Sequence, residues 1–157
     1  LMKRSTKTGI SAGTTGFLLG LLAFLGGLQH GKKESCEIKV DKAHISQYSL
    51  KKYGTHNLKI DVTTKCTKPQ KYSSLSVSVY KVERSLTTKV YEFPAKSYPA
   101  DKKHPEWAYA SDRELLCVGF HPLKYYGTAE GTVFMRSGKE IPVQGKSTLI
   151  PYVDCVI

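Results

Sequence analysis

Short runs of alternating apolar and polar residues begin near residue 35, and this alternation constrains the fold more than any other feature of the sequence. Over residues 36–40, Cys, Ile and Val alternate with Glu and Lys, and residues 58–66 place Leu, Ile, Val, Thr and Cys at every second position. A period of two predicts strands that bury one face against a core. These two runs are therefore expected to be strands.

Further strands are expected as far as the C-terminal end, over residues 74–82, 87–93, 114–120, 124–136 and 140–156, with a short strand near 107–110 inside a long loop over 94–113. Proline and glycine residues are expected to end or bend several of these strands. Pro94 and the pair His121-Pro122 are expected to stop strands, and Pro142 and Pro151 to suit an edge strand. Gly127 and Gly131 are expected to mark a bulge or bend, and Ser137-Gly138 a tight turn. No segment after residue 31 has a helical period of useful length.

About seven short strands with turns between them are typical of an antiparallel β-sandwich. The predicted fold class is all-β: an antiparallel immunoglobulin-like β-sandwich of about seven strands, preceded by one N-terminal apolar helix. The chain of 157 residues suits one domain plus an export segment. We expect a signal peptide or N-terminal membrane anchor over residues 1–31 and an exported β-sandwich domain over residues 32–157.

The N-terminal segment is organised like an export signal. Lys3, Arg4 and Lys7 precede 19 residues without a charge, 10–28, of which only the 12 residues 17–28 are strongly apolar. The shorter stretch matches a signal peptide, whereas the longer one nearly spans a hydrocarbon layer of about 30 Å. No Ala-x-Ala cleavage motif follows. Two alternatives stay open: a cleaved signal peptide, or an anchor that enters the membrane through residues 10–28.

The expected exported part is strongly basic. Residues 32–157 hold 21 of the 24 Lys and Arg and all 13 Asp and Glu, a surplus of 8 positive charges. Such a surplus favours anionic surroundings, such as lipid headgroups or an anionic wall polymer, although scattered lysines also serve solubility alone. Another envelope protein is a further candidate partner. Nucleic acid is not favoured as a partner, because the location is expected to be outside the cell.

The four cysteines predict two disulfides. Cys36, Cys66, Cys117 and Cys155 form no Cys-x-x-Cys pair, and an even count in an exported chain indicates disulfides rather than a metal site. If the strands over 36–40 and 58–66 pair antiparallel, the start of one meets the end of the other. This geometry favours Cys36–Cys66, and the same parity favours Cys117–Cys155. The alternative, Cys66–Cys117 with Cys36–Cys155, stays open.

The sequence contains no recognisable catalytic or cofactor motif. The five histidines are spread singly, and neither a Gly-rich phosphate loop nor a Gly-x-Ser-x-Gly elbow is present. We therefore expect no catalytic residue, no metal and no cofactor, and a protein that is not an enzyme.

Aromatic and basic residues instead suggest a binding face. Rings beside cations give a large contact area at a low entropic cost, although the same rings also fill cores. The candidate binding residues form two groups along the chain: Lys124, Tyr125 and Tyr126, and Trp107 with Lys102 and Lys103.

The order of these segments resembles a group of small exported proteins. Between residues 36 and 155 it runs Cys … Ile-Asp-Val-Thr-Thr-Lys-Cys-Thr-Lys-Pro … Leu-Ser-Val-Ser-Val-Tyr … Cys … Tyr-Tyr-Gly-Thr-Ala-Glu-Gly … Cys. It is similar to small two-disulfide β-sandwich proteins of Gram-positive bacteria that have no assigned function, and in a broad sense to immunoglobulin-like domains. The expected function is a non-enzymatic binding or structural module at the cell envelope, membrane-anchored or secreted. The alternatives are a small secreted effector or inhibitor and, less favoured, an envelope hydrolase.

Overall fold

The computed structural model describes residue 31 and residues 33–157. The apolar helix and the signal peptide or anchor predicted for residues 1–31 therefore lie, apart from Gly31, outside the described residues. The chain divides into two units, 1–33 and 34–157, and the second unit is described below. Within the described residues, no helix is long and apolar enough to cross a membrane.

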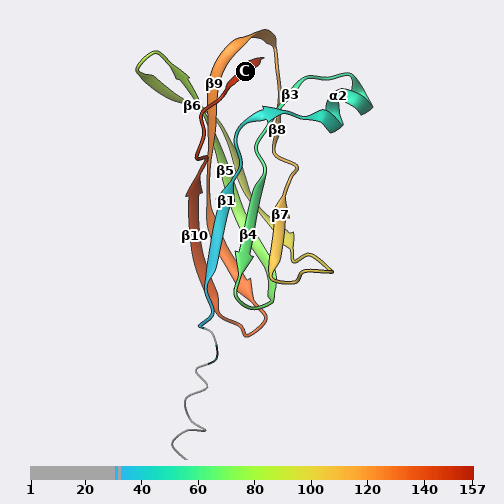
Figure 1. Ribbon diagram of the computed structural model, residues 1–157, viewed down its shortest axis with the longest axis vertical. Coiled ribbons are helices and arrows are strands. Elements are labelled where there is room, and N and C mark those ends of the chain that lie inside the picture. Colours follow the sequence, from blue (N-terminus) through green and yellow to red (C-terminus); the bar gives the residue numbers. More distant parts are fainter. Residues whose placement is uncertain (1–30, 32) are drawn as a thin grey trace, which may run out of the picture. The chain divides into compact units, whose positions relative to one another are not determined.

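The second unit consists mainly of antiparallel strands in three sheets (Figure 1). The first sheet has the order β1 (Cys36–Val40), β4 (Val62–Cys66), β7 (Trp107–Ala110). The second has the order β10 (Glu140–Lys146), β9 (Gly119–Met135), β5 (Gln70–Glu83), β6 (Leu86–Pro99), with β11 (Tyr152–Val156) also paired to β9. The third and smallest has the order β2 (His44–Ile45), β3 (Asn57–Lys59), β8 (Glu114–Leu116). The all-β, antiparallel part of the predicted fold class is confirmed.

The first two sheets share one hydrophobic core. Alternate residues of β5 point inward, and Val77 is fully buried together with Val62 of β4 and Val133 of β9. Full burial of such a side chain stabilises a fold by roughly 1.5–3 kcal/mol. The opposite residues of β5 point away from this core, and they form the face that carries the candidate site.

The small sheet carries a helix that the sequence pattern did not predict. Helix α2 (Gln47–Tyr53) begins at Ser46, whose hydroxyl accepts a hydrogen bond from the Ser49 amide, and ends at Gly54, which has a φ of 67°. A capping serine and a left-handed glycine are ordinary helix ends. The sequence shows no helical period of useful length after residue 31, and a helix of 7 residues is too short to produce one.

Two strands run past the prolines that were expected to stop them. Strand β6 continues through Pro94 to Pro99, since it lies at a sheet edge and its register with β5 shifts between Leu75 and Val77, opposite Pro94. A bulge at an edge tolerates a missing amide donor. Strand β9 likewise continues through Pro122, which is paired with Asp154 of β11.

Other predicted strands are divided. The strand expected over 58–66 is broken into β3 and β4 near Asp61, and the one expected over 140–156 is β10 followed by β11. The strand expected over 114–120 ends as β8 at Leu116, before Cys117. Two predictions hold: Pro142 lies in the edge strand β10, and the residues at 137–138 turn the chain between β9 and β10.

The two glycines of β9 do not mark a bulge. The β5–β9 register is continuous from Tyr72 to Val82. Instead the glycines permit close approach: a Cβ at Gly131 would lie 1.9 Å from the Ser74 carbonyl oxygen, and one at Gly127 would lie 2.7 Å from the side chain of Ile60.

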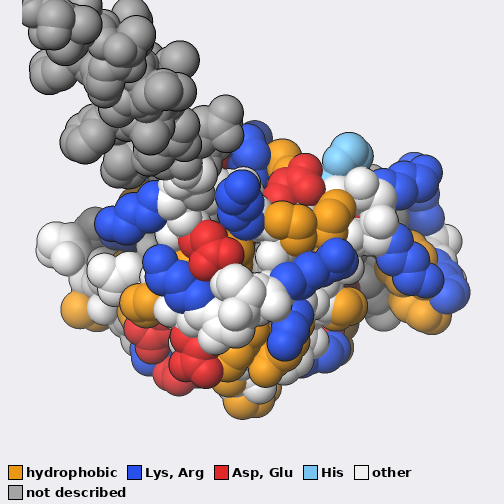
Figure 2. All heavy atoms as spheres, turned by 90° about the horizontal axis from the view of Figure 1, so that it is seen from below, with side chains coloured by type: hydrophobic (Ala, Val, Ile, Leu, Met, Phe, Trp, Pro, Cys, Tyr) orange, Lys and Arg blue, Asp and Glu red, His pale blue; other side chains and the backbone are white. Residues whose placement is uncertain are grey.

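Basic side chains are spread over the end of the domain at which β1 begins, which Figure 2 shows from below. This end is formed by the turns that connect β4 to β5, β6 to β7 and β9 to β10. The C-terminus and helix α2 lie at the opposite end (Figure 1).

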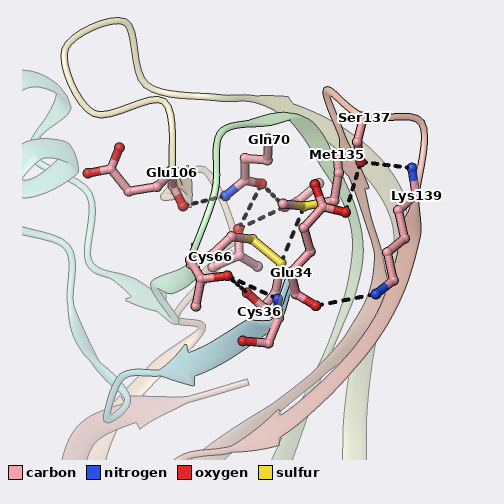
Figure 3. The surroundings of a disulfide bond; sticks show 12 residues. Glu34, Cys36, Cys66, Gln70, Glu106, Met135, Ser137 and Lys139 are labelled. Carbon is pink, nitrogen blue, oxygen red and sulfur yellow. Dashed lines mark hydrogen bonds between the residues drawn. A yellow bond between two sulfur atoms is a disulfide. The ribbon is translucent and has the colours of Figure 1, made fainter. Parts of the chain in front are cut away.

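Both disulfides join the cysteines that strand parity favoured. Cys36 lies directly opposite Cys66 in the β1–β4 register, and their sulfurs are bonded (Figure 3). Cys117 is bonded to Cys155 of β11. The chain has no free cysteine.

Candidate functional site: a trough on the outer face of the large sheet

The outer face of β5 and β9 carries a stripe of small polar residues. Because alternate residues share a face, Ser74, Ser76 and Ser78 all point away from the core. Their partners on β9 are Thr132, Glu130 and Thr128, respectively. A sheet face built from such short side chains lies lower than the side chains around it.

The low stripe is a trough. Its larger part has a volume of about 640 Å³ and its smaller part about 430 Å³, and Ser76, Glu130 and Gln144 line both parts. The two parts therefore adjoin each other. The polar groups along it are hydroxyls, one amide, the carboxylates of Glu92 and Glu130, and the ammonium groups of Lys89 and Lys146. None of the described residues that line it is a histidine or a cysteine.

An aromatic pair stands at each end of the stripe. Tyr72 and Phe134 are stacked with ring centroids 4.5 Å apart, and Tyr80 and Tyr126 are stacked at 5.0 Å. Both pairs join residues directly opposite each other on β5 and β9. Tyr72 and Tyr80 are eight residues apart, which is about 26 Å in a strand. This length suits a chain-like ligand better than a single small molecule.

Lysines extend the Tyr80–Tyr126 pair into a row across four strands. The ammonium group of Lys89, on β6, lies 5.9 Å from the Tyr80 ring centroid, and that of Lys146, on β10, lies 4.1 Å from the Tyr126 centroid. Cation–π contacts of this kind stabilise both partners. Lys89 also forms a 2.7 Å ion pair with Glu92, whose hydrogen bond raises the pKa of Lys89 above its ordinary value.

The two groups of predicted binding residues do not form one face. Residues 124–126 are paired with residues 80–82 of β5, whereas Trp107 is paired with Lys65, beside Cys66. The start of β5 lies next to the latter group, because the Gln70 amide donates to the Pro105 carbonyl. The groups therefore lie at opposite ends of β5.

Within the first group, Tyr125 is not a surface residue. It is fully buried, its hydroxyl donates to the Cys155 carbonyl at 3.0 Å, and burial raises the pKa of its phenol. Tyr125 is thus a core residue, and its selection for binding was wrong. Tyr126 points to the opposite face and stacks on Tyr80, but only 8% of it is exposed. Lys124 lies 4.9 Å from the ring centroid of Tyr152.

Within the second group, Trp107 is half-buried on β7 and lies 5.1 Å from the Lys65 ammonium group. Lys102 and Lys103 are exposed in the preceding turn. The Asp101 carboxylate closes this turn by accepting hydrogen bonds from the amides of Lys103 and His104, and these bonds lower the pKa of Asp101.

Sequence reasoning missed the trough itself. The outward parity of Ser76 and Ser78 was evident, but the pairing of this stripe with Thr128 and Glu130 depends on the β5–β9 register. A register between strands 50 residues apart has no local sequence signal.

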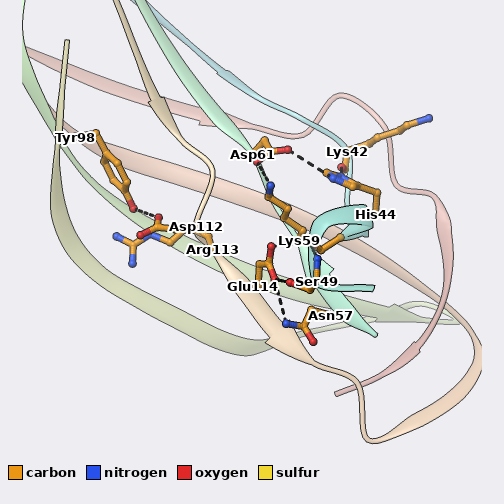
Figure 4. A network of polar contacts seen from close by, with 11 residues as sticks. Lys42, His44, Ser49, Asn57, Lys59, Asp61, Tyr98, Asp112, Arg113 and Glu114 are labelled. Atoms are coloured by element: carbon orange, nitrogen blue, oxygen red, sulfur yellow. Dashed lines mark hydrogen bonds and ion pairs between the residues drawn. The ribbon is translucent and has the colours of Figure 1, made fainter. Parts of the chain in front are cut away.

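The most connected polar group outside the trough supports the fold. The Glu114 carboxylate accepts hydrogen bonds from Ser46 at 2.6 Å, from Asn57 at 3.0 Å and from Ser49 (Figure 4). Burial alone would raise the pKa of Glu114, but these bonds and the charge of Lys59 outweigh burial and lower it. The carboxylate therefore fastens the start of helix α2 to β3 and β8.

A second network connects β6 to the residues between β7 and β8. Arg113 is buried and donates to the Pro94 carbonyl at 3.0 Å, and the hydroxyl of Tyr98 donates to Asp112 at 2.7 Å. Burial, followed by the bond to Asp112, raises the pKa of Tyr98. Both networks connect strands. The carboxylates of Asp112 and Glu114 also line one open pocket, of about 610 Å³, but each accepts hydrogen bonds from its neighbours.

Among the described residues, no cluster of three or more His, Cys, Asp or Glu side chains is placed to hold a metal ion. Comparison with protein-family models, with curated proteins and with solved structures found no match. The trough is therefore interpreted from its own chemistry.

Proposed function

We propose that this protein is a non-enzymatic binding module of the cell envelope, exported and either membrane-anchored or secreted, which holds an extended glycan chain in the trough. The observation that carries the proposal is the continuous polar stripe between two aromatic pairs. The two disulfides support an oxidising, extracellular location, because such bonds persist there. Two antiparallel sheets around one core support an immunoglobulin-like sandwich.

The chemistry of the trough favours a glycan over a peptide. Serine and threonine hydroxyls both donate and accept hydrogen bonds, as do the hydroxyls of a sugar, and a carboxylate and an amide add directional partners. A peptide is commonly held through its backbone at an open sheet edge. The trough lies over β5 and β9, whose backbone groups are already paired on both sides.

Titration with soluble cell-wall glycan oligosaccharides, followed by calorimetry or NMR shifts, tests the proposal. We expect saturable binding that Glu130→Ala with Gln144→Ala weakens at least tenfold. Thr63→Ala is the matched control, because Thr63 points outward from the other sheet, and it should leave binding unchanged. Absence of binding to every oligosaccharide, or equal loss in the control, would contradict the proposal. Hydrolysis of the oligosaccharide would instead establish the envelope hydrolase.

One surface favours the alternative, a secreted effector or inhibitor. Near Cys117, the side chains of Leu116, Val118 and Phe120 are 60%, 78% and 61% exposed. Exposed apolar side chains close together are typical of protein contacts. If this alternative holds, Val118→Ser with Phe120→Ser removes binding of the protein partner, and the substitutions in the trough do not.

A further inference from the structure

We propose that the end of the domain at which β1 begins, called here the basic end, docks on a surface of anionic lipid headgroups. The basic end comprises residues 34–36, 65–71, 100–107 and 135–139. The inference rests on the anchored form of the proposed function, in which residues 10–28 enter the membrane. It is independent of the trough and of any glycan.

Hydrogen bonds hold the four segments of the basic end together. The Cys66 amide donates to the Glu106 carbonyl at 2.8 Å, and the Thr67 amide donates to the Ser35 carbonyl at 2.9 Å. The Arg136 amide donates to the Pro69 carbonyl at 3.2 Å. The Cys36–Cys66 disulfide adds a covalent link. The side chains on these segments therefore form one ordered surface.

Most of the excess charge of the domain lies on this surface. Residues 34–157 contain 19 basic residues (Lys and Arg) and 13 acidic residues (Asp and Glu). The basic end alone contains 7 basic and 3 acidic residues. It thus holds four of the six excess positive charges. All seven basic residues are exposed: Lys65, Lys68, Lys71, Lys102, Lys103, Arg136 and Lys139.

Two of the three acidic residues of the basic end accept hydrogen bonds within the fold. Glu34 accepts a hydrogen bond from the Ser137 hydroxyl at 2.9 Å (Figure 3), and Asp101 closes its own turn. Glu106 lies 3.8 Å from the His104 ring. Each of the three is partly covered, so the surface presented outward is mainly cationic.

Chain length connects this surface to the expected anchor. Leu28, the last residue of the apolar run, is six residue steps from Glu34. Six extended residues reach at most about 22 Å. The potential of anionic lipids falls off over about 8 Å at physiological salt, and a tether of this length lets the cationic surface come within that distance of the bilayer. Tethering therefore favours headgroups over a distant polyanion.

The test uses the full chain reconstituted into vesicles of zwitterionic lipid alone or with a quarter of anionic phosphatidylglycerol. Backbone hydrogen exchange is measured in the basic end and at the β5–β6 turn, residues 83–86. We expect slower exchange at the basic end only with anionic lipid, and loss of this protection in 0.5 M salt. Each Lys near such a surface contributes about fivefold to docking. Lys102→Gln with Lys103→Gln should therefore weaken docking about 25-fold.

The control is Lys42→Gln with Lys51→Gln, which removes the same charge elsewhere on the domain and should leave protection unchanged. Equal exchange in both kinds of vesicle, with the chain retained, would overturn docking and leave the anchor standing. Release of the chain from vesicles by a salt wash would overturn the anchor and this inference with it. Protection by soluble teichoic acid but not by anionic vesicles would assign the basic end to a wall polymer and overturn the lipid assignment.

Discussion

At the scale of single residues, Gly131 shows how a missing side chain lets two strands approach each other closely. Its position on β9 brings the strand so close to the β5 backbone that an added Cβ would lie 1.9 Å from the Ser74 carbonyl oxygen. A backbone oxygen in a paired strand cannot turn aside as a flexible side chain does. The β5–β9 pair therefore depends on glycine at this position.

We predict that Gly131→Ala destabilises the domain by about 1–3 kcal/mol, because forcing an atom into a packed site shifts the surrounding backbone. Denaturant unfolding measures the change. Ser76→Ala, at a half-buried position in the same trough, is the control and should change the free energy of unfolding by less than about 0.5 kcal/mol. A neutral Gly131→Ala variant would show that the two strands are not held at this separation.

Glu114 gives a prediction about pH. Its pKa is lower in the folded state than in the unfolded state, so the ionised carboxylate stabilises the fold above its unfolded pKa of about 4.3. This contribution is lost as the pH falls through the folded pKa. Glu114→Gln should therefore reduce the free energy of unfolding at pH 7 and make stability less dependent on pH below about 4.5. Thermal unfolding of both proteins from pH 3 to pH 7 measures this, with Glu37→Gln on the exposed side of β1 as the control.

Parity predicts the orientation of residues better than their role. The rule that favoured Cys36–Cys66 also applies to β9, where Val133 and Met135 point inward, so that Tyr125 must do so as well. The sequence therefore contained the signal that Tyr125 and Tyr126 point to opposite faces of β9, although neighbouring side chains bury Tyr126 as well. Tyr125 was instead selected as a binding residue from its residue type alone.

At the scale of elements, the two disulfides secure different kinds of junction. Cys36 and Cys66 are already opposite each other in the β1–β4 ladder, whereas Cys117 lies between β8 and β9. Cys155 belongs to β11, which pairs with the opening residues of β9. The second disulfide therefore fastens the C-terminal strand to the junction of two sheets.

We predict that replacing Cys117 and Cys155 together with Ala lowers the free energy of unfolding by about 3–4 kcal/mol, since the bond closes a separation of 38 residues. Hydrogen exchange should then accelerate first in β8 and β11. The Cys36→Ala, Cys66→Ala variant is the comparison: its loss of stability should be similar, but its faster exchange should be confined to β1 and β4. A loss below 1 kcal/mol in the first variant would contradict the prediction.

The elements that the sequence mispredicted share a physical cause. Pro94 lies in an edge strand at a register shift, where a backbone donor is not needed. Pro122 lies in a part of β9 that is paired with β11 on one side only. At both positions, pairing with a neighbouring strand overrides the local stop signal. Helix α2 depends on its two caps rather than on a periodic apolar face. Strand existence was therefore predictable, whereas strand length was not.

At the scale of the whole domain, three surfaces differ in character. The trough runs along the outer face of the large sheet, the basic end gathers lysines from four separate segments, and exposed apolar side chains lie near Cys117. The sequence predicts the excess of positive charge but not its position. Lysines at 68, 102 and 139 become neighbours only because the turns of different sheets are hydrogen-bonded to one another.

The last prediction concerns the oxidation state of the protein in its own compartment. If the domain folds outside the cytoplasm, protein recovered from cells and denatured in alkylating agent should gain no label before reduction and four labels after it, because all four cysteines are paired. Intact mass measures both states and also reports the N-terminus: loss of residues 1 to about 31 indicates a cleaved signal peptide, and their retention indicates the anchor. Labelling of the unreduced protein at two or more thiols would contradict an oxidising location. The proposal for the basic end requires that the mass shows a retained N-terminus. A cleaved domain would meet lipid without a tether and dock far more weakly.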